Sequence, residues 1–464
     1  MRWFLMNNDS VKVPEEDKTL SPEKLFYNWF AANIGIMGFV YGAIIVSYRL
    51  SFWQSITAAL IGALTFAIPG WVAMIGRREG VTTFKMSRAA FGIYGNKIPN
   101  FMAWLNMVGW LAVNVITGTL LFSAMLKTIK VPQTGFTKFI CLVIFAGLVI
   151  LSGIFKEDTL AKIQTWLSWI FGALTLVMLI MFLMNANWGE AFSMKAGSWL
   201  TGWLPAVAFV AAGSSISWSM AAADWGAYVR PDTKLSATFW NTTMGAATPL
   251  FILMAGGILL STISPSLATA SDPYQVMYNA IPSWFGFLYF LVAAGGIIPQ
   301  CLVSFRSARI NLATIGIEVT QKTSLIIHAL IIVVISVYVL FISGNFLTNF
   351  ELFLNFLGIC LASWVAIFLV DNVIYRRQGY SVFLMKEDSP VRYNWPGIIS
   401  WVIATVFGFL FTSNAVYRGP FAHGIFENNS SLAVFVSGIA AIIVVLVLSL
   451  FVKKDKRTGD EQHG

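Results

Sequence analysis

Residues 28–43, NWFAANIGIMGFVYGA, and residues 209–230, FVAAGSSISWSMAAADWGAYVR, decide the fold of this chain. They belong to two long apolar stretches, at about 26–48 and 196–223, and each stretch is interrupted near its middle by small and polar residues. A membrane-spanning helix keeps its backbone groups hydrogen-bonded to one another. Where the helix is interrupted inside the membrane, the freed backbone groups need a polar cavity or a ligand as a partner. The two stretches therefore predict a transport site at a pair of broken helices.

The composition of the chain places it in a lipid bilayer. Of its 464 residues, 57% are hydrophobic and 11% are charged, and the mean hydropathy is +0.74, which is too apolar for an ordinary water-soluble globule. A spanning helix needs roughly 20 mostly apolar residues. The sequence thus predicts an all-α integral membrane protein whose twelve spans lie at about 26–48, 53–76, 100–126, 135–154, 160–184, 200–223, 239–263, 283–307, 322–344, 349–374, 393–413 and 430–452.

The basic residues are unevenly distributed between the two sides of these spans. With both ends inside, the predicted cytoplasmic segments hold 24 of the 30 Lys and Arg residues. This bias is the positive-inside signal of a multi-pass membrane protein, and it accounts for the net charge of +9 without a nucleic-acid partner. The residues at 1–25 and 453–464 are accordingly expected to be cytoplasmic tails.

The segments between the spans are too short for a separate domain, so residues 26–452 form one membrane domain. The interrupted spans are the first and the sixth, and a unit of five spans crosses the membrane an odd number of times, so its second copy inserts upside down. We therefore expect one repeat at about 26–184, an inverted repeat at about 200–374, and two extra helices at about 393–452. The basic loop at 76–97, with Phe84 and Phe91, predicts a helix at the cytoplasmic membrane interface.

Polar residues inside the interrupted spans are candidates for ligand contact. Asn33, beside Ala32, is costly in the middle of a membrane unless it has a partner, whereas Gly38 and Gly42 fit close helix packing. The sixth span carries four serines around Trp218, which offer short hydroxyls beside a flat aromatic surface for a planar polar ligand: Ser214, Ser215, Ser217 and Ser219. The same hydroxyls can alternatively bond to carbonyls of their own helix.

Two further spans place amides near aromatic or helix-breaking residues. Trp110 lies in the middle of the third span, although most membrane Trp lies at the interfaces, and Asn114 follows it by one helical turn. A ring for stacking and an amide that both donates and accepts suit a nucleobase-like heterocycle. In the eighth span, Gln300 follows Pro299, and Ser304 offers a hydroxyl to a small cation.

Several function classes lack support in the sequence. His328 and His423 have no carboxylate or thiol at ligand spacing, so no metal site is predicted. No catalytic constellation or phosphate-binding loop occurs, which argues against an enzyme or an ATP-driven pump and favours transport driven by a gradient, with no cofactor. The three cysteines, which lie in predicted spans, are expected to be packing residues: Cys141, Cys301 and Cys360. An amino-acid or osmolyte carrier remains a rival, while a membrane enzyme or nutrient sensor is disfavoured.

Four motifs in order along the chain resemble the nucleobase/cation symporter family, the purine/cytosine permease-like transporters of purines, cytosine, uracil, allantoin, hydantoins and thiamine precursors. WFAAN at 29–33 is similar to the family's first-span segment, and SRAAFGIYG at 87–95 is similar to its first cytoplasmic loop. SWSMAAADWGAYVRPDT at 217–233 and VDNVIYRRQGY at 370–380 resemble the ends of its sixth and tenth spans.

The resemblance implies a leucine-transporter-type fold, with two inverted five-helix repeats and two additional helices. It implies that helices one and six unwind at Ala31–Ile34 and at Ser214–Trp218, and that the base stacks on Trp110 and is recognised by Asn114 and Gln300. A coupling cation, Na⁺ or H⁺, would bind near three residues: Ala31, Ile34 and Ser304.

The function expected from this resemblance is symport of a purine or cytosine-like base by alternating access, in the plasma membrane, by a monomer. Carriage of a related heterocycle, such as allantoin, a hydantoin or hydroxymethylpyrimidine, is the alternative.

Overall fold

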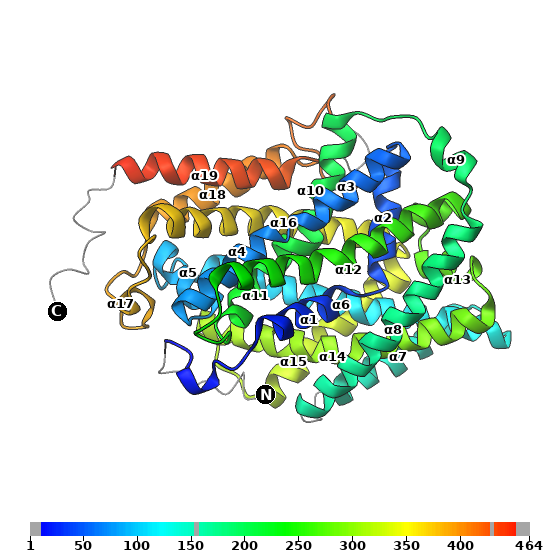
Figure 1. Cartoon of the computed structure of the whole chain (residues 1–464), viewed down its shortest axis with the longest axis horizontal. Helices are drawn as coiled ribbons and strands as arrows, with labels where there is room; N and C mark the ends of the chain where they lie inside the picture. Colours follow the sequence, from blue (N-terminus) through cyan, green and yellow to red (C-terminus); the bar gives the residue numbers. More distant parts are fainter. Residues whose placement is uncertain (1–10, 153–156, 427–430, 452–464) are drawn as a thin grey trace.

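The computed structural model describes residues 11–152, 157–426 and 431–451, which form a bundle of long helices (Figure 1). Among these residues there is no strand, only two isolated bridges, Leu20 with Val229 and Ser413 with Arg418. Helices α5 and α17 and the end of α19 lie at one end of the bundle, and α2, α9 and α13 lie toward the other. The predicted all-α membrane architecture is confirmed.

The helices have the following bounds. The first half of the chain forms α1 (Pro22–Asn33), α2 (Met37–Ser47), α3 (Phe52–Leu64), α4 (Ala67–Glu79), α5 (Thr83–Phe91), α6 (Lys97–Leu126), α7 (Gly135–Ser152), α8 (Glu157–Asn185) and α9 (Trp188–Ser193). The second half forms α10 (Leu204–Ala211), α11 (Ser217–Gly226), α12 (Leu235–Ile263), α13 (Pro273–Asn279), α14 (Ser283–Ile315), α15 (Gln321–Val337), α16 (Phe346–Val370), α17 (Val382–Met385), α18 (Trp395–Leu410) and α19 (Ala433–Phe451).

Nearly all predicted spans correspond to helices that are long and apolar enough to cross a membrane. Ten such helices occur in the described part of the chain, and the bent pair of α1 and α2 makes an eleventh. The remaining predicted span, at 393–413, corresponds to α18, which has only 16 residues. At 1.5 Å per residue, this helix covers about 24 Å of a hydrocarbon core about 30 Å thick, so the count of twelve spans stays a prediction.

The first span is broken, as the sequence predicted. Helices α1 and α2 meet at an angle of 64°, and the backbone leaves the helical conformation at Ile34, with φ −85° and ψ 88°. The Asn33 side chain donates a hydrogen bond of 2.9 Å to the Trp29 carbonyl one turn earlier, and so keeps the last turn of α1 helical. The break therefore lies at 34–36 and not at the expected Ala31–Ile34.

The predicted unwinding of the sixth span at Ser214–Trp218 is wrong. The helix is continuous over Trp199–Gly226, with a π-helical segment at Ala212–Ile216 between α10 and α11. The hydroxyl groups of Ser214 and Ser219 donate to the carbonyls of Val210 and Ser215, four residues earlier, at 2.5 and 2.8 Å. The serines therefore bond to the backbone of an intact helix, the alternative that their sequence pattern left open.

The loop at 76–97 contains the predicted helix, α5, and the protein covers its aromatic residues. Phe84 and Phe91 are buried in the protein, and the Phe84 ring stacks on Trp364 of α16 with 5.0 Å between centroids. The segment after α17 covers this region, because Ile93 donates a backbone hydrogen bond to Val391. Helix α5 is thus packed within the protein at one end of the bundle, and its place at the membrane interface stays a prediction.

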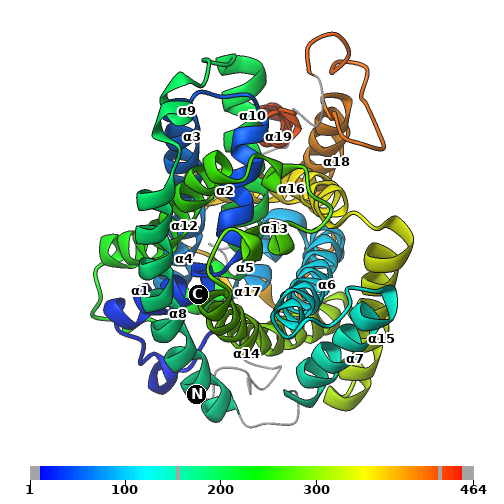
Figure 2. The same ribbon diagram turned by 90° about the vertical axis from the view of Figure 1, so that its right-hand side faces the viewer.

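The helices differ strongly in how much of their surface the protein covers. In the most apolar window of α6, 83% of residues are buried, against 22% in α8, so α6 is central and α8 has a largely lipid-facing surface. Figure 2 shows α6 inside the bundle and α7, α8 and α15 at its periphery. All three cysteines are buried and unbridged, which agrees with their predicted role in packing.

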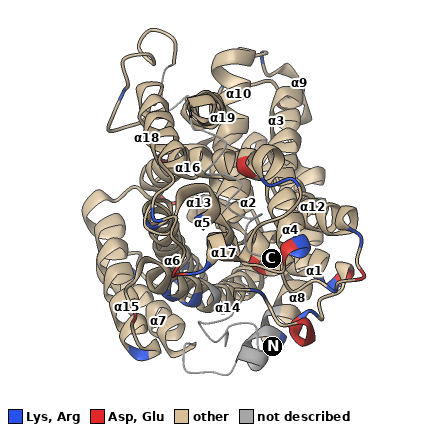
Figure 3. Ribbon diagram, turned by 90° about the vertical axis from the view of Figure 1, so that its left-hand side faces the viewer, with Lys and Arg blue, Asp and Glu red and all other residues tan. Residues whose placement is uncertain are grey.

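Charged residues lie on several segments at the end of the bundle that carries α5 and α17 (Figure 3), and some of them are buried. Asp371 accepts a hydrogen bond of 2.9 Å from the Arg376 guanidinium, and both side chains are largely buried. Asp224 accepts the backbone N–H of Thr83 at 2.8 Å and so caps the first turn of α5. These contacts give both aspartates structural roles.

Candidate functional site: a cavity at the broken helix

A cavity of about 110 Å³ lies at the break between α1 and α2 and reaches α6, α11 and α14. This is several times the roughly 10–15 Å³ that a single water molecule requires, so the cavity has room for a small organic molecule. Eight of the nine residues predicted to contact substrate line it: Ala32, Asn33, Trp110, Asn114, Ser214, Ser217, Trp218 and Gln300.

The ninth predicted residue, Ser215, does not line this cavity. Its hydroxyl is within 2.7 Å of the hydroxyl of Thr65, which lies in the turn between α3 and α4, and it also donates to the Ala211 carbonyl at 3.3 Å. The side chain is fully buried at this helix contact. Ser215 therefore connects two helices on the side of the sixth span that faces away from the cavity.

Helix α6 supplies an aromatic wall. The half-buried Trp110 side chain packs edge-to-face against Phe350 and Phe353 of α16, at centroid distances of 5.8 and 5.9 Å. A Cβ at Gly109 would lie 2.0 Å from the Phe353 ring, so only glycine there allows Phe353 to come this close. Because Trp110 is supported at its edges and lines the cavity, it is held in place for stacking against a planar ligand.

The π-helical turn forms the facing wall. The Ser217 hydroxyl donates to the Ala212 carbonyl at 2.7 Å, so it serves the helix as Ser214 does. The Trp218 ring contacts Trp29 of α1 edge-to-face at 5.6 Å, which connects this wall to the last turn of the broken span. This wall therefore exposes the Trp218 indole and parts of Ser214 and Ser217 to the cavity. Most of its backbone groups are hydrogen-bonded within the helix.

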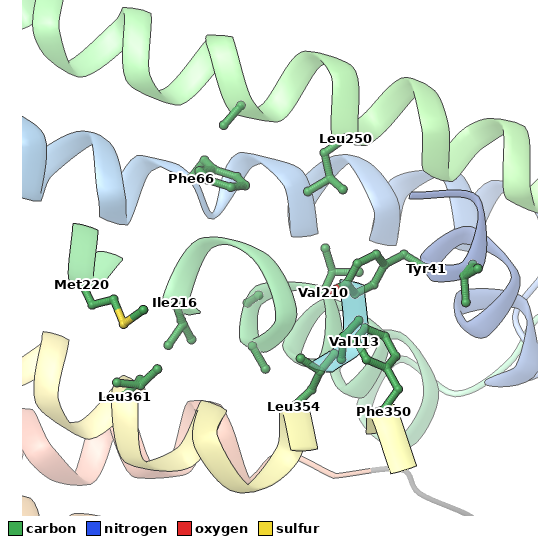
Figure 4. Packing of buried hydrophobic residues seen from close by; sticks show 14 of the residues in the cluster. Tyr41, Phe66, Val113, Val210, Ile216, Met220, Leu250, Phe350, Leu354 and Leu361 are labelled. Carbon is green, nitrogen blue, oxygen red and sulfur yellow. The ribbon is translucent and has the colours of Figure 1, made fainter. Parts of the chain in front are cut away.

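On the α2 side the cavity is closed by large side chains. The Tyr41 hydroxyl donates a buried hydrogen bond of 2.9 Å to the Gly213 carbonyl, and its ring meets Phe350 edge-to-face at 5.7 Å. Figure 4 shows Tyr41, Phe350 and Leu354 gathered between α2, α10 and α16. A Cβ at Gly213 would lie 2.1 Å from the Tyr41 oxygen, so this closure depends on glycine.

A second group of contacts strengthens the same closure. Tyr274 of the short helix α13 is fully buried, and its hydroxyl lies 3.1 Å from the Thr117 hydroxyl of α6 and 3.4 Å from the Met37 sulfur of α2. Burial raises the pKa of Tyr274 well above its ordinary value, so the hydroxyl stays protonated and can donate. Met37 and Thr117 both line the cavity, and α13 therefore covers its α2 end.

Toward α1 the lining is more open. Ala32 and Asn33 are half-buried and Gly35 is exposed, in contrast to the buried stretch Gly38–Ile45 of α2. The cavity is thus sealed at one end and has partly accessible walls at the other. This asymmetry is the arrangement that a transporter needs in a state that is open to one side.

The three residues predicted to bind a cation lie at different places relative to the cavity. Ser304 lines it, and its hydroxyl donates to the Gln300 carbonyl at 3.2 Å. Ala31 and Ile34 are half-buried and do not line it. They belong to the end of α1, where the last carbonyls of a helix lack partners within the helix. A set of oxygen ligands across α1 and α14 therefore remains a prediction.

Three polar residues of the cavity were not predicted from the sequence: Tyr41, Asn106 and Thr117. Asn106 precedes Trp110 by four residues, the interval that also separates Trp110 from Asn114, so the 3.6-residue helical period could have identified it. Tyr41 and Thr117 carried no comparable signal, because their partners lie more than 150 residues away in the sequence.

A polar cavity at a broken helix, enclosed by a bundle of apolar spans, defines this protein as a membrane transporter. The family model described as "permease for cytosine/purines, uracil, thiamine, allantoin" matches residues 12–450. The chain therefore belongs to this family of permeases.

Individual relatives agree with this assignment. The chain is 28% identical over 427 residues to YxlA of Bacillus subtilis, provisionally named a purine-cytosine permease, with 88% of this chain and 89% of the relative covered. It is 24% identical over 414 residues to the purine-cytosine permease fcyB of Emericella nidulans, with 86% and 78% covered. Among solved structures, the transporter Mhp1 in a closed conformation with bromovinylhydantoin bound matches with a TM-score of 0.74 at 17% identity, covering 96% of both chains. The predicted transporter fold is confirmed.

Proposed function

We propose that this permease imports a nucleobase, a purine or a cytosine-like base, together with a cation by alternating access. The observation that carries the proposal is the α6 wall, where Trp110 lines the cavity between two amides, Asn106 and Asn114. An indole stacks on any planar heterocycle, and amides match the alternating donors and acceptors of a base edge. The names of the relatives YxlA and fcyB support the same substrate class.

The chemistry of the cavity disfavours the rival substrate class of amino acids and osmolytes. Among the described residues, no Lys, Arg, Asp or Glu lines the cavity, so a charged amino or carboxylate group would be bound by neutral polar groups alone, without a countercharge. A neutral heterocycle avoids this cost, because it carries no charge to desolvate. Allantoin, a hydantoin and hydroxymethylpyrimidine share the required shape and polarity and remain the alternative ligands.

Alternating access is supported by the unequal ends of the cavity. Tyr41, Phe350 and Tyr274 seal the α2 end, while the lining at Ala32–Gly35 is partly accessible. Transport would require the α2 seal to open while the α1 side closes around the base. Rigid-body movement of the helices is sufficient for this opening and closing.

The coupling ion would be Na⁺ or H⁺. A Na⁺ site would combine the Ser304 hydroxyl with carbonyls at Ala31 and Ile34, because hard cations take oxygen ligands. H⁺ coupling would instead require a titratable group, and in the described part of the chain the Tyr41 hydroxyl is the one such group that lines the cavity. The geometry therefore favours Na⁺ as the first ion to test.

The expected setting is the plasma membrane, with a monomer whose two termini are cytoplasmic. The basic loops on the α5 side support this orientation through the positive-inside bias. In that orientation, the α2 end of the cavity faces the outside and the α1 end faces the cytoplasm.

The decisive experiment is uptake of labelled adenine, cytosine, uracil and allantoin into proteoliposomes under separate Na⁺ and H⁺ gradients. We expect accumulation of adenine or cytosine that depends on one of the gradients and is unaffected by an excess of amino acids. Uptake of none of these heterocycles, or inhibition by amino acids alone, would refute the proposal.

A further inference from the structure

Helix α6 presents three side chains to the cavity at intervals of four residues: Asn106, Trp110 and Asn114. Four-residue spacing places them one above another on the same helix face. Asn106 is only 1% exposed, so its amide has lost nearly all contact with bulk water. A buried amide requires hydrogen-bond partners for two N–H groups and one oxygen.

The oxygen of the Asn106 amide has an incomplete partner. The Ser217 hydroxyl lies 3.3 Å from Asn106 Oδ1, but it lies only 2.7 Å from the Ala212 carbonyl of its own helix. A hydroxyl has one proton to donate, and the shorter distance favours the carbonyl. Asn106 Oδ1 is therefore left to compete for a donor that is already engaged.

The nitrogen of the same amide is still less satisfied. Among the described residues, its hydrogen-bond partner is the Met220 sulfur, at 3.7 Å. A thioether is a weak acceptor, and one sulfur cannot satisfy two N–H groups. Leaving a buried donor or acceptor unsatisfied is costly, so a ligand that completes both groups is bound preferentially.

The neighbouring amide is in a different situation. The Asn114 side chain is 9% exposed, against 1% for Asn106, so water reaches it more easily. Asn106 is therefore the more deeply buried amide of this wall, where an incomplete set of hydrogen-bond partners costs more. Its position one turn from Trp110 places it beside the edge of any ring that stacks on that indole.

We propose that Asn106 determines base specificity by pairing with an edge of the ligand that carries an acceptor ring nitrogen beside an exocyclic amino group. The amide N–H would donate to the ring nitrogen, and Oδ1 would accept from the amino group, the bidentate pairing by which Asn selects adenine elsewhere. Adenine and cytosine both carry such an edge. This inference rests on the proposed function and identifies the part of the substrate that the site recognises.

Competition binding on the purified full-length protein tests the inference with adenine and with purine, which has the same ring system but lacks the amino group. We expect wild-type protein to prefer adenine over purine by about tenfold or more, since a good bidentate pair discriminates by that order. In Asn106→Ala the preference falls to about one. In Asn106→Asp adenine binding falls further, because a carboxylate accepts but cannot donate to the ring nitrogen.

Asn241→Ala is the matched control. Asn241 is an asparagine in a membrane helix, α12, whose amide donates to the Ala237 carbonyl four residues earlier, and it does not line the cavity. This variant keeps the wild-type ratio of adenine to purine affinity. Size-exclusion chromatography identifies the folded variants, and Asn106→Ser, which also removes the amide, replaces Asn106→Ala if that protein aggregates.

The outcomes separate the inference from the function on which it rests. Wild-type protein that binds none of adenine, purine and cytosine refutes the proposed function, and the role of Asn106 with it. Wild-type protein that binds adenine and purine equally refutes the role of Asn106 alone. A folded Asn106 variant that lacks the amide but retains the wild-type preference for adenine over purine also refutes the role of Asn106 alone.

Discussion

Replacing Gly213 with alanine should open the α2 end of the cavity. The added Cβ would lie 2.1 Å from the Tyr41 oxygen and 2.6 Å from Leu354 Cδ1. Leu354 Cδ1 ends a flexible side chain and can rotate away. The Tyr41 ring cannot yield as easily, because Phe209 and Phe350 flank it at centroid distances of 5.4 and 5.7 Å.

The size of the effect follows from two contributions. Loss of the hydrogen bond from Tyr41 to the Gly213 carbonyl costs about 0.5–1.5 kcal/mol, and displacement of a packed ring costs about 1–3 kcal/mol. Together, about 1.5–4.5 kcal/mol is lost from the closed arrangement only, because the two groups separate when the end opens. At about 1.4 kcal/mol per factor of ten, the open population rises roughly 10- to 1,600-fold.

Cysteine labelling measures this population. Thr117 lines the cavity near the closed end and is buried, so Thr117→Cys, with the three native cysteines replaced, should react slowly with a membrane-impermeant maleimide added outside cells. Gly213→Ala should accelerate labelling, whereas Tyr41→Phe, which loses only the hydrogen bond, should accelerate it by about tenfold at most. Combining the two should be milder than Gly213→Ala alone, because phenylalanine lacks the clashing oxygen.

Gly147→Ala is the control substitution, since a Cβ at this position of α7 would meet no atom within 4 Å. The explanation is refuted if Gly213→Ala labels no faster than Gly147→Ala. It is equally refuted if adding Tyr41→Phe to Gly213→Ala leaves the labelling rate unchanged, because the clash would then lie elsewhere.

Three further substitutions test other parts of the structure. Trp110→Ala should weaken base binding by about 5- to 150-fold, the loss of one stacking contact, whereas Trp104→Ala, on the same helix but outside the cavity, should bind normally in the same radioligand assay. Ser304→Ala should raise the Na⁺ concentration needed for half-maximal uptake, and an unchanged Na⁺ dependence would exclude this hydroxyl as a ligand. Arg376→Ala should lower the free energy of unfolding by about 3–5 kcal/mol, because it leaves Asp371 buried without its cation; a melting temperature in detergent equal to wild type would contradict this.

Much of the fold was readable from the sequence because the bilayer imposes simple rules. Apolar length identified the spans, and the small residues of the first span correctly indicated both a break and close packing. A Cβ at Gly38 or Gly42 would lie 2.5 Å from Leu253 Cβ or 2.1 Å from the Met254 carbonyl oxygen, so both glycines permit the predicted close contact, here with α12. The assembly of Trp110, Asn114 and Gln300 around one cavity followed from their placement at mid-span.

The sixth span shows where local patterns become ambiguous. A run of serines in an apolar helix is equally consistent with an unwound segment and with hydroxyls bonded to a continuous backbone. The choice depends on tertiary partners: Thr65 meets Ser215, and Tyr41, 172 residues from Gly213 in the sequence, donates to its carbonyl.

The π-helical turn at Ala212–Ile216 meets both requirements. It preserves the hydrogen bonding of the spanning helix, and it directs the Gly213 carbonyl toward Tyr41 of α2. The same carbonyl lies in the wall of the cavity and in the seal of its α2 end. Movement of Tyr41 away from Gly213 would therefore change the seal and the binding wall together. The Gly213 carbonyl oxygen thus belongs to both the seal and the binding wall. It couples ligand binding to gating more directly than two separately unwound helices would.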